Sequence, residues 1–589
     1  MGRNGFAMLD TIPIDAFRFD PSLQVWTNPS NTQFGYSEGA DTERRTLEIL
    51  RRTKDHSLFS EELQQEIQDW PTQYHFSPGR QNLLRHLKLQ KDMSVLELGA
   101  GCGAVTRQLG EAAGEVWAVE GGPVRAACIA ARTGDLPNVR VFCSDFQTIR
   151  IDRQFDVVTL IGVLEYSPLF IAAENPFLQC LRLAHSFLKP TGTLVLAIEN
   201  QLGLKYFCGA PEDHTGRPYD GIQDFYRHRG VRTCGRAELN RLLAEAGFAG
   251  VEFQYPYPDY KLPSWVLTDE ALEIEGFDPS AILHRVDSTH DGRKTSHPAD
   301  ERKVRSVLHR NGLLADLSNS FLVLAGASAS TTQLTPAGLL AAGYVTERQP
   351  WFNTCTRMLV NDQNQIIVEK SRLCAAQPPE PSPLKNVVGS EPYRAGLQLE
   401  AVIVDSIQRD GLDAGLAHLR QWVDYLIRVG LRDKDAGDPY ASKLKPEFFD
   451  CTPPNLIVAG DQLHFIDAEW RYDGDLPLRT HILRYLRQLE SREKAVLARY
   501  LSARAPFARQ LAERLNIPIS TSQYREAKQW MHQINRWIVP EYSSSRFARR
   551  KQSKKPDTSR WSHWLKIRFR RSADRRLQNP NRHPRLLAN

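Results

Sequence analysis

Strand-like apolar runs alternate with helix-like segments between about residues 74 and 325, and this alternation limits the possible folds more than any other feature of the 589-residue chain. The strand-like runs are "SVLELG", "EVWAVE", "VRVFCSD", "FDVVTLIG", "GTLVLAIE", "VEFQYPY" and "NSFLVLAG". The helix-like segments span residues 80–89, 105–112, 123–132, 177–188 and 236–246. Such alternation predicts an α/β domain with a doubly wound, mostly parallel sheet. We expect it to cover 74–326, with a polar insert at about 268–314.

The first strand-like run leads into a glycine-rich turn, "VLELGAGCGA", which is suited to binding a cofactor. Glycines between a strand and a helix let backbone N–H groups approach a ligand without interference from Cβ atoms. Gly99, Gly101 and Ala104 fit the G-x-G-x-x-G/A pattern of dinucleotide-binding proteins. Glu97 before the turn, with a third glycine at Gly103, instead fits the first motif of S-adenosylmethionine (SAM) methyltransferases. The turn alone leaves both cofactors open.

Acidic residues near the following strands favour SAM. Glu97 would repel a pyrophosphate, whereas SAM carries a sulfonium and an amine. Glu120 ends the second strand, where an acid can accept both ribose hydroxyls, although a solvated strand end is the alternative. Asp145 and Phe146 follow the third strand, where methyltransferases hydrogen-bond and stack the adenine; a helix cap is the alternative for Asp145. With Glu165 after the fourth strand, this order of markers resembles class I SAM-dependent methyltransferases.

The resemblance implies a Rossmann-like, seven-stranded fold with SAM as the cofactor. Methyl transfer is a displacement at the sulfonium methyl, for which the enzyme mainly supplies proximity and orientation. The cofactor-binding residues that the resemblance implies are Glu97, Gly99, Gly101, Gly103, Glu120, Asp145, Phe146 and Glu165.

The loop after the fifth strand, "AIENQLGLKYFCGAPEDHTG", is expected at the carboxyl edge of the sheet, where ligands bind. His214 in this loop is the candidate base for removing a proton from a hydroxyl or phosphate acceptor, because its ordinary pKa lies near neutrality. The loop, "YPYPDYKLP" and "LSNSFLVLAG" look like segments of methyltransferases from bacterial surface-polysaccharide clusters, including those of lipopolysaccharide O-antigen biosynthesis. This resemblance implies a glycan or lipid-linked glycan acceptor; a small molecule or another macromolecule remains open.

A second group of polar residues lies in region 345–540, after an expected linker at 327–344. Asp450, Asn455 and Asp467 frame the run "DCTPPNLIVAGDQLHFIDAEW", which resembles the catalytic segment of choline-kinase-like and aminoglycoside-phosphotransferase-like enzymes. The resemblance implies an α+β kinase-like domain that uses ATP and Mg²⁺. Asp450 would act as base, Asn455 and Asp467 would hold Mg²⁺, and Lys370 would contact ATP phosphates.

Region 345–540 also departs from the kinase pattern, because no glycine-rich loop precedes Lys370. Glu391 or Glu400, in a helical pattern, is the expected ion-pair partner of Lys370. Bifunctional methyltransferase–kinases that cap O-antigen chains share this domain order. The alternative is a scaffold of a glycan assembly complex, with a vestigial kinase-like region that recruits glycosyltransferases.

The ends of the chain differ in charge. Residues 546–589 hold 15 Lys and Arg against two acidic residues, within a chain of net charge +6. Trp561 and Trp564 alternate with basic residues in this tail (541–589), which predicts contact with an anionic membrane surface. An acidic protein partner, RNA or a merely solubilising role are the alternatives; overall, nucleic acid is not the expected partner.

The cysteine pattern and the N-terminal sequence predict a cytoplasmic protein, peripheral on the inner face of the plasma membrane. The nine cysteines include no C-x-x-C, and no His cluster with zinc-site spacing is present, so a metal is expected only in the kinase-like region. No signal peptide is recognisable at the start. Residues 1–73 are expected to be an N-terminal extension without an assigned role.

Overall fold

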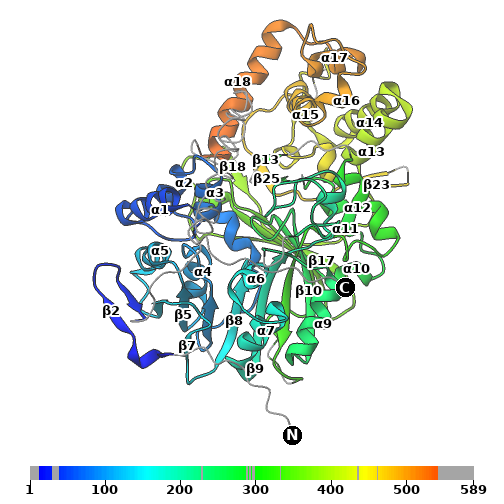
Figure 1. Ribbon diagram of the computed structural model, residues 1–589. Helices are drawn as coiled ribbons and strands as arrows, with labels where there is room; N and C mark the ends of the chain where they lie inside the picture. Colours follow the sequence, from blue (N-terminus) through cyan, green and yellow to red (C-terminus); the bar gives the residue numbers. More distant parts are fainter. Residues whose placement is uncertain are drawn as a thin grey trace, which may run out of the picture. The chain divides into compact units, whose positions relative to one another are not determined.

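A mixed sheet of 14 strands organises the part of the chain that the computed structural model describes (Figure 1). The described residues are 12–28, 37, 39–226, 230–286, 289–290, 293–294, 299–329, 331, 333–433, 435, 437–460 and 462–540, with backbone alone at 289–290 and 293–294. The strand order is β19-β17-β16-β15-β11-β10-β14-β9-β8-β4-β5-β6-β3-β2.

The middle of this sheet confirms the predicted Rossmann-like arrangement. Parallel pairing joins β6, β5, β4, β8 and β9, while β14 and β10 follow antiparallel beyond β9. These strands are β4 (Ser94–Leu98), β5 (Glu115–Glu120), β6 (Val139–Cys143), β8 (Phe155–Ile161), β9 (Leu188–Glu199), β10 (Gly250–Tyr257) and β14 (Ser320–Gly326). The order in which the chain adds strands to the sheet reverses between β4 and β8. The ligand crevice is therefore expected at the carboxyl ends of these two strands.

Alternate residues of each central strand pack on opposite faces of the sheet. Leu96 of β4 and Leu196 of β9 belong to one core cluster, while Val95 and Val195 belong to another. Both faces are therefore covered, as parallel sheets require. The covering helices are α4 (Ala104–Ala112), α5 (Pro123–Thr133), α7 (Pro176–Ser186) and α9 (Arg236–Ala246).

One expected helix is wrong. Residues 80–89 do not form an α-helix; instead a 3₁₀ turn spans Pro78–Leu83. Arg80 donates to the backbone carbonyls of Tyr260 and Lys261, at 2.8 and 3.2 Å, and Asn82 donates to that of Pro263 at 2.9 Å. These tertiary hydrogen bonds hold the segment against the loop after β10 and override its local helical pattern.

The sheet continues across the segment expected to be a linker. On the β10 side it is extended by β11 (Trp265–Thr268), β15 (Leu339–Val345), β16 (Thr354–Val360), β17 (Ile366–Arg372) and β19 (Gly389–Pro392). Residues 339–344 thus belong to a buried strand, and the sheet is continuous across position 345. The expected domain boundaries at 326 and 345 stay predictions.

The N-terminal extension and the insert pack onto this framework. β3 (Val25–Thr27) pairs in parallel with β6, β2 (Arg18–Asp20) lies outside it, and α1 (Ala40–Arg52) packs on α5. Two further helices of the extension are α2 (Glu61–Gln65) and α3 (Trp70–Phe76). The insert contributes α10 (Glu270–Glu273), α11 (Pro279–Leu283) and α12 (Glu301–Arg310).

A second hydrophobic core, mainly helical, is formed chiefly by residues after β19, joined by Phe352 and Leu384. Trp422 and Tyr485 are fully buried in it, and the Trp422 indole donates to the Cys451 carbonyl at 3.0 Å. Its helices are α13 (Leu399–Asp410), α14 (Leu412–Tyr425), α15 (Leu478–Arg492), α16 (Lys494–Leu497), α17 (Phe507–Arg514) and α18 (Thr521–Ile538). A hairpin of β23 (Leu456–Ala459) and β24 (Gln462–Phe465) lies between α14 and α15.

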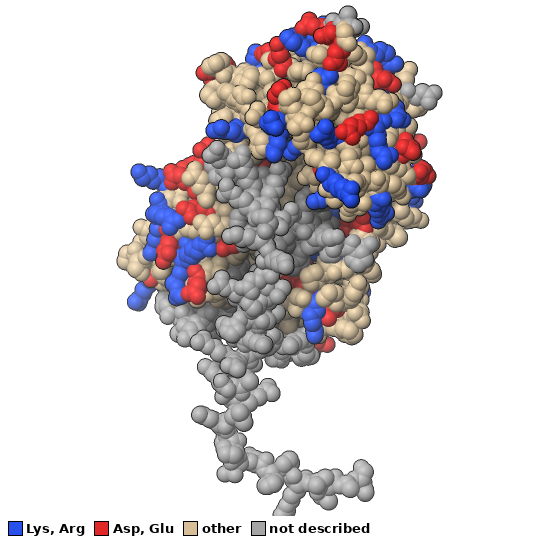
Figure 2. Space-filling model, turned by 90° about the horizontal axis from the view of Figure 1, so that it is seen from above, with Lys and Arg blue, Asp and Glu red and all other residues tan. Residues whose placement is uncertain are grey.

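The charges on the described surface are mixed. On the face seen in Figure 2, Lys and Arg side chains are interspersed with Asp and Glu. None of the helices in the described ranges combines the length and the apolar character that crossing a membrane would need. The basic tail, with Trp561 and Trp564, lies outside the described residues.

Candidate functional site

The glycine turn after β4 has a backbone that requires its glycines. Gly99, Gly101 and Gly103 have φ of 75°, 58° and 80°, a region that side-chain-bearing residues seldom adopt. At Gly99 a Cβ would also lie 2.6 Å from the Val163 side chain, whereas at Gly101 it would meet open space. The turn is therefore shaped by backbone conformation at all three glycines and by close packing at Gly99 and Gly103.

Glu120, at the end of β5, lies directly beneath this turn. One carboxylate oxygen accepts from the Gly101 N–H at 2.8 Å, and the other accepts from the Gly122 N–H at 2.8 Å and from Arg125 at 2.6 Å. Burial raises the pKa of Glu120, against the opposing effect of Arg125. Glu120 thus fixes the turn, and its expected contact with a ribose stays a prediction.

Glu97 is buried below the turn, where the Thr106 hydroxyl of α4 donates to it at 2.5 Å. Burial raises its pKa to about 8, so the carboxyl is mainly neutral at pH 7 when no cation lies beside it. Its negative charge, which the sequence suggested as an attraction for SAM, is thus not expressed in this state. The hydrogen bond to Thr106 joins β4 to α4 beneath the turn.

Asp145 and Phe146 lie in the turn after β6. The Asp145 carboxylate accepts from the backbone N–H of Gln147 at 2.9 Å, and burial raises its pKa. No helix begins here, because a short strand follows at Ile149–Arg150, so the alternative of a helix cap is wrong. Phe146 is half-buried against the main core. Adenine binding by these two residues stays a prediction.

Three acid–base side chains from separate segments meet at the carboxyl edge of β8 and β9. Glu165 lies in the short turn Leu164–Tyr166 after β8, Glu199 ends β9, and His214 comes from the following loop. One oxygen or nitrogen from each lies within 4.8 Å of the others. We call Glu165, Glu199 and His214 the acid–base cluster. The sequence singled out Glu165 and His214 separately, but their meeting with Glu199 follows from the sheet.

Burial and mutual charge shift the pKa of each member of the acid–base cluster. Burial, reinforced by Glu199, raises the pKa of Glu165 to about 8. Burial alone would lower the pKa of His214, but Glu199 outweighs it and raises that pKa to about 9. The Glu199 pKa falls well below its usual range, because Lys261 and His214 outweigh the effect of burial. At neutral pH His214 therefore holds a proton, and it must lose this proton before it can act as a base.

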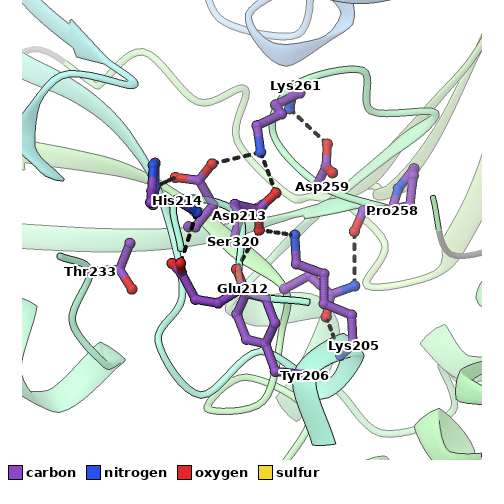
Figure 3. A network of polar contacts seen from close by, with 12 residues as sticks. Lys205, Tyr206, Glu212, Asp213, His214, Thr233, Pro258, Asp259, Lys261 and Ser320 are labelled. Carbon is purple, nitrogen blue, oxygen red and sulfur yellow. Dashed lines mark hydrogen bonds and ion pairs between the residues drawn. The ribbon is translucent and has the colours of Figure 1, made fainter. Parts of the chain in front are cut away.

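A network of charged side chains holds the loop that carries His214 (Figure 3). Lys261 contacts Glu199 at 2.7 Å and Asp213 at 2.8 Å, and Lys205 contacts Asp213 at 2.6 Å. The Glu212 carboxylate accepts from the backbone N–H of His214 at 2.8 Å. Sequence reasoning missed Lys261, whose only sequence signal was its place in the aromatic, proline-rich run after β10.

The acid–base cluster lies beside the glycine turn. A Cβ at Gly162 would approach the Tyr260 hydroxyl at 2.8 Å and Glu165 at 3.6 Å, and the next residue, Val163, packs on Gly99. The cluster and the turn therefore flank the point between β4 and β8 where the sheet reverses its winding. This geometry places the glycine turn next to buried acid–base groups.

The central strands of this site match a known family. Residues 96–194 match a family model described as a methyltransferase domain. This segment is therefore similar to a methyltransferase domain. The match contains the glycine turn, Glu120, Asp145 and Glu165, whereas Glu199 and His214 follow it. No curated protein matches the chain.

Solved structures resemble part of the chain at low identity. A chain from the complex of the Haloferax volcanii Trm112 methyltransferase activator with a methyltransferase is 19% identical, with a TM-score of 0.27, covering 44% of this chain and 90% of that one. A Thermotoga maritima SAM-dependent methyltransferase is 14% identical (TM-score 0.24; 42% and 89% covered). Haemonchus contortus phosphoethanolamine N-methyltransferase 2 is 15% identical (TM-score 0.26; 42% and 52% covered). At these TM-scores the likeness carries no information about function.

Outside the methyltransferase domain, the structure brings the expected kinase-like residues into one neighbourhood. Lys370 of β17 forms ion pairs with Asp467 and with Glu469, the latter at 2.6 Å. Arg348 pairs with the same Glu469 at 2.5 Å. We call Lys370, Asp467 and Glu469 the lysine–acid cluster. Burial would lower the pKa of Lys370, but the two acids outweigh it and raise this pKa.

Asp450 and Asn455 precede the β23–β24 hairpin and bind each other. The Asn455 amide donates to the Asp450 carboxylate at 2.8 Å, and Arg484 of α15 pairs with the same carboxylate at 3.1 Å. The expectation for the partner of Lys370 is wrong, because neither Glu391 nor Glu400 contacts it. Glu391 lies in strand β19 and accepts from the Asp467 backbone N–H at 3.1 Å, while Glu400 of α13 pairs with an arginine of α15.

Proposed function

We propose that the chain transfers the methyl group of SAM to an oxygen of a bacterial surface glycan or of its lipid-linked precursor. The observation that carries the proposal is the buried acid–base cluster, which lies beside the glycine turn at the winding reversal of a methyltransferase domain. The turn would hold the methionine part of SAM, Glu120 its ribose, and Asp145 with Phe146 its adenine.

The reaction needs an acceptor oxygen close to the sulfonium and a place for its proton. The oxygen attacks the methyl carbon, the carbon–sulfur bond breaks, and sulfur keeps the electron pair in S-adenosylhomocysteine. His214 can accept the proton only in its neutral form, and Glu165 and Glu199 are the carboxylates within reach of it. Burial limits the access of water to this cluster and strengthens its electrostatic effect on the developing charge.

The glycan as acceptor rests on the resemblance of the segments around His214, Lys261 and β14 to surface-polysaccharide methyltransferases. In this proposal the protein works in the cytoplasm at the inner face of the plasma membrane, beside a glycosyltransferase. The basic tail would contact the anionic lipid. Its sequence is more basic than the face in Figure 2, where Lys and Arg are interspersed with Asp and Glu.

Phosphotransfer from ATP is a second candidate function, favoured by the lysine–acid cluster and by the hydrogen bond between Asn455 and Asp450. Lys370 would contact the phosphates, Asn455 and Asp467 would hold Mg²⁺, and Asp450 would accept the proton of a substrate hydroxyl. A scaffold role for the same region makes the opposite prediction, namely that ATP does not bind. Titration of the full chain with ATP and Mg²⁺ separates the two, since binding that Asp467→Asn abolishes supports phosphotransfer.

The methyl-transfer proposal is tested with the full chain, radiolabelled SAM and lipid-linked glycan fractions. Label that enters the glycan fraction and falls strongly in His214→Gln supports the proposal. Label that enters only small molecules, nucleic acid or protein would overturn the glycan assignment. Absence of SAM binding in calorimetry would overturn the function as a whole.

A further inference from the structure

The acid–base cluster has the donor set of a divalent cation site. It offers one carboxylate oxygen from Glu165, one from Glu199 and one imidazole nitrogen from His214, all within 4.8 Å of one another. Two carboxylates and one imidazole suit a first-row divalent cation such as Mn²⁺. Nothing in the spacing of these residues along the sequence indicates a metal site, because they are 34 and 15 residues apart.

Glu165 supplies an independent sign that a ligand is missing from its surroundings. The residue is 1% exposed, and its Oε2 atom is buried without a hydrogen-bond partner among the described residues. A buried carboxylate oxygen without a partner is costly unless something binds it. The side chain lies with Glu199 and His214, so a cation shared with them would satisfy this oxygen.

The neighbouring cations do not take the place of such a metal ion. Lys261 contacts one oxygen of Glu199 at 2.7 Å, while the other oxygen lies 3.6 Å from His214 Nε2 and faces the cluster. Lys261 and Lys205 both also pair with Asp213. Four acidic side chains, Glu165, Glu199, Glu212 and Asp213, thus lie around two lysines and His214, and a cation that binds His214 would displace its proton.

The surrounding contacts are also those that hold metal ligands in place. Lys261 orients Glu199, and the Glu212 carboxylate fixes the backbone of His214 at 2.8 Å. Partners behind the ligands determine how precisely a site is formed and how tightly it binds. The cluster is therefore supported by a network and does not depend on flexible surface side chains.

We propose that Glu165, Glu199 and His214 bind one divalent cation, and that this cation binds the acceptor oxygen next to the methyl group of SAM. The inference rests on the proposed methyl transfer and deepens it. Three protein ligands leave up to three positions on a six-coordinate ion, enough for two adjacent oxygens of an acceptor and one water. The acceptor class is thus a compound with neighbouring oxygens, such as a vicinal diol of a sugar or a hydroxyl beside a phosphate.

The cation would promote the reaction by ionising the acceptor. A hydroxyl bound to a divalent cation loses its proton more readily, and the proton passes to water. The resulting oxygen anion attacks the methyl carbon of SAM, the carbon–sulfur bond breaks, and sulfur retains the electron pair. In this account Glu165, Glu199 and His214 are ligands, and none of them needs to be the base.

The test measures Mn²⁺ binding to the full chain after EDTA treatment. The chain carries Asp467→Asn, so that the proposed Mg²⁺ ligand of the lysine–acid cluster does not contribute to the binding. We expect one Mn²⁺ per chain and at least a tenfold loss of affinity in Glu165→Gln. Glu245→Gln, at an exposed residue of α9, is the matched control and should bind as the background does. Pulsed electron paramagnetic resonance should show nitrogen coupling to the bound Mn²⁺ that disappears in His214→Gln.

SAM binding is measured in the same samples, so that the two proposals fail separately. Bound SAM without any binding of Mn²⁺, Mg²⁺ or Zn²⁺ at millimolar concentration would overturn the cation site and leave methyl transfer intact. Mn²⁺ affinity that is unchanged in Glu165→Gln, together with nitrogen coupling that is unchanged in His214→Gln, would also overturn the cation site. Loss of SAM binding in the background protein would overturn the proposed function itself.

Discussion

The acid–base cluster and the lysine–acid cluster are both groups of charged residues, but they differ in burial, since the Asp467 side chain is 41% exposed, and in how the charges are balanced. In the lysine–acid cluster each carboxylate has a cationic partner. Lys370 forms ion pairs with Asp467 and Glu469, and Arg348 forms a further one with Glu469. In the acid–base cluster Glu165 retains a buried oxygen that has no hydrogen-bond partner in the part of the chain that the structure describes. The difference indicates that the charges of the lysine–acid cluster are balanced within the protein, whereas the acid–base cluster is arranged to bind an added group.

The largest expected effect is on methyl transfer. Glu165→Gln removes an ionisable carboxyl from the acid–base cluster while keeping the shape of the side chain, and we expect the rate to fall by about 10²–10⁴-fold. The readout is S-adenosylhomocysteine formed in the presence of the glycan fraction, compared with Glu245→Gln. Retention of half the rate or more would mean that the unpartnered carboxylate has no part in the reaction.

Stability should respond in the opposite way to the corresponding changes in the two clusters. Lys370→Met leaves Asp467 and Glu469 without their shared ammonium, and we expect a loss of about 3 kcal/mol in the free energy of unfolding. Glu165→Gln replaces a buried carboxyl that lacks a full set of partners, so in EDTA its unfolding free energy should be unchanged or higher. Urea unfolding at pH 7 measures both. An equal loss of unfolding free energy in Lys370→Met and Glu165→Gln would contradict the difference in charge balance between the clusters.

A smaller effect concerns the response of the second core to acid. His481 of α15 is fully buried next to Cys451, and burial, helped by Arg484, lowers its pKa to about 3. The unfolded chain takes up a proton near pH 6.5 while the folded chain does not, so stability falls as the pH drops from about 6.5 toward 3. The slope contributed by His481 is at most about 1.4 kcal/mol per pH unit.

His481→Gln should flatten this pH dependence, whatever its effect on stability at pH 7. Urea unfolding between pH 7 and pH 4 gives the slope for both proteins. A slope that is unchanged in the variant would show that His481 is already protonated in the folded protein.

The smallest expected effect is at Gly101, in the glycine turn. Alanine meets no atoms there, but φ of 58° disfavours a side chain, which costs about 1 kcal/mol. At Gly99 alanine has the same backbone penalty and also meets Val163 at 2.6 Å, so Gly99→Ala should be less stable than Gly101→Ala. Thermal unfolding of the two variants measures the difference, and the reverse order would contradict the packing.

Much of the fold followed from the sequence because apolar periodicity indicates buried strands. All seven predicted strands are present, since residues such as Val95 and Leu96 are apolar on both faces. The helix expected at 80–89 failed because Arg80 and Asn82 bind carbonyls about 180 residues away, which no local pattern reveals. The strand of 339–345 was taken for part of a linker, although Gly343 fits closely beneath Trp265 of a neighbouring strand.

The site was predicted only in its parts. A run of glycines after an apolar strand is a local sequence pattern, and it correctly predicted the turn at Gly99–Gly103, where all three glycines have a left-handed backbone. The meeting of Glu165 with Glu199 depends on the pairing of β8 with β9, where Ile161 lies opposite Ala197, and this register is not visible in the sequence. The same holds for Lys261, which reaches Glu199 from the far side of β14.

The most direct test of the central claim is calorimetric titration of the full chain with S-adenosylhomocysteine. The account predicts one site per chain, abolished in Gly99→Val, where a branched side chain would displace Val163 from the turn. Gly250→Ala, at the open start of β10, is the matched control and should bind as the native chain does. No binding by the native chain, or binding that survives in Gly99→Val, would contradict the claim that this turn holds the methyl donor.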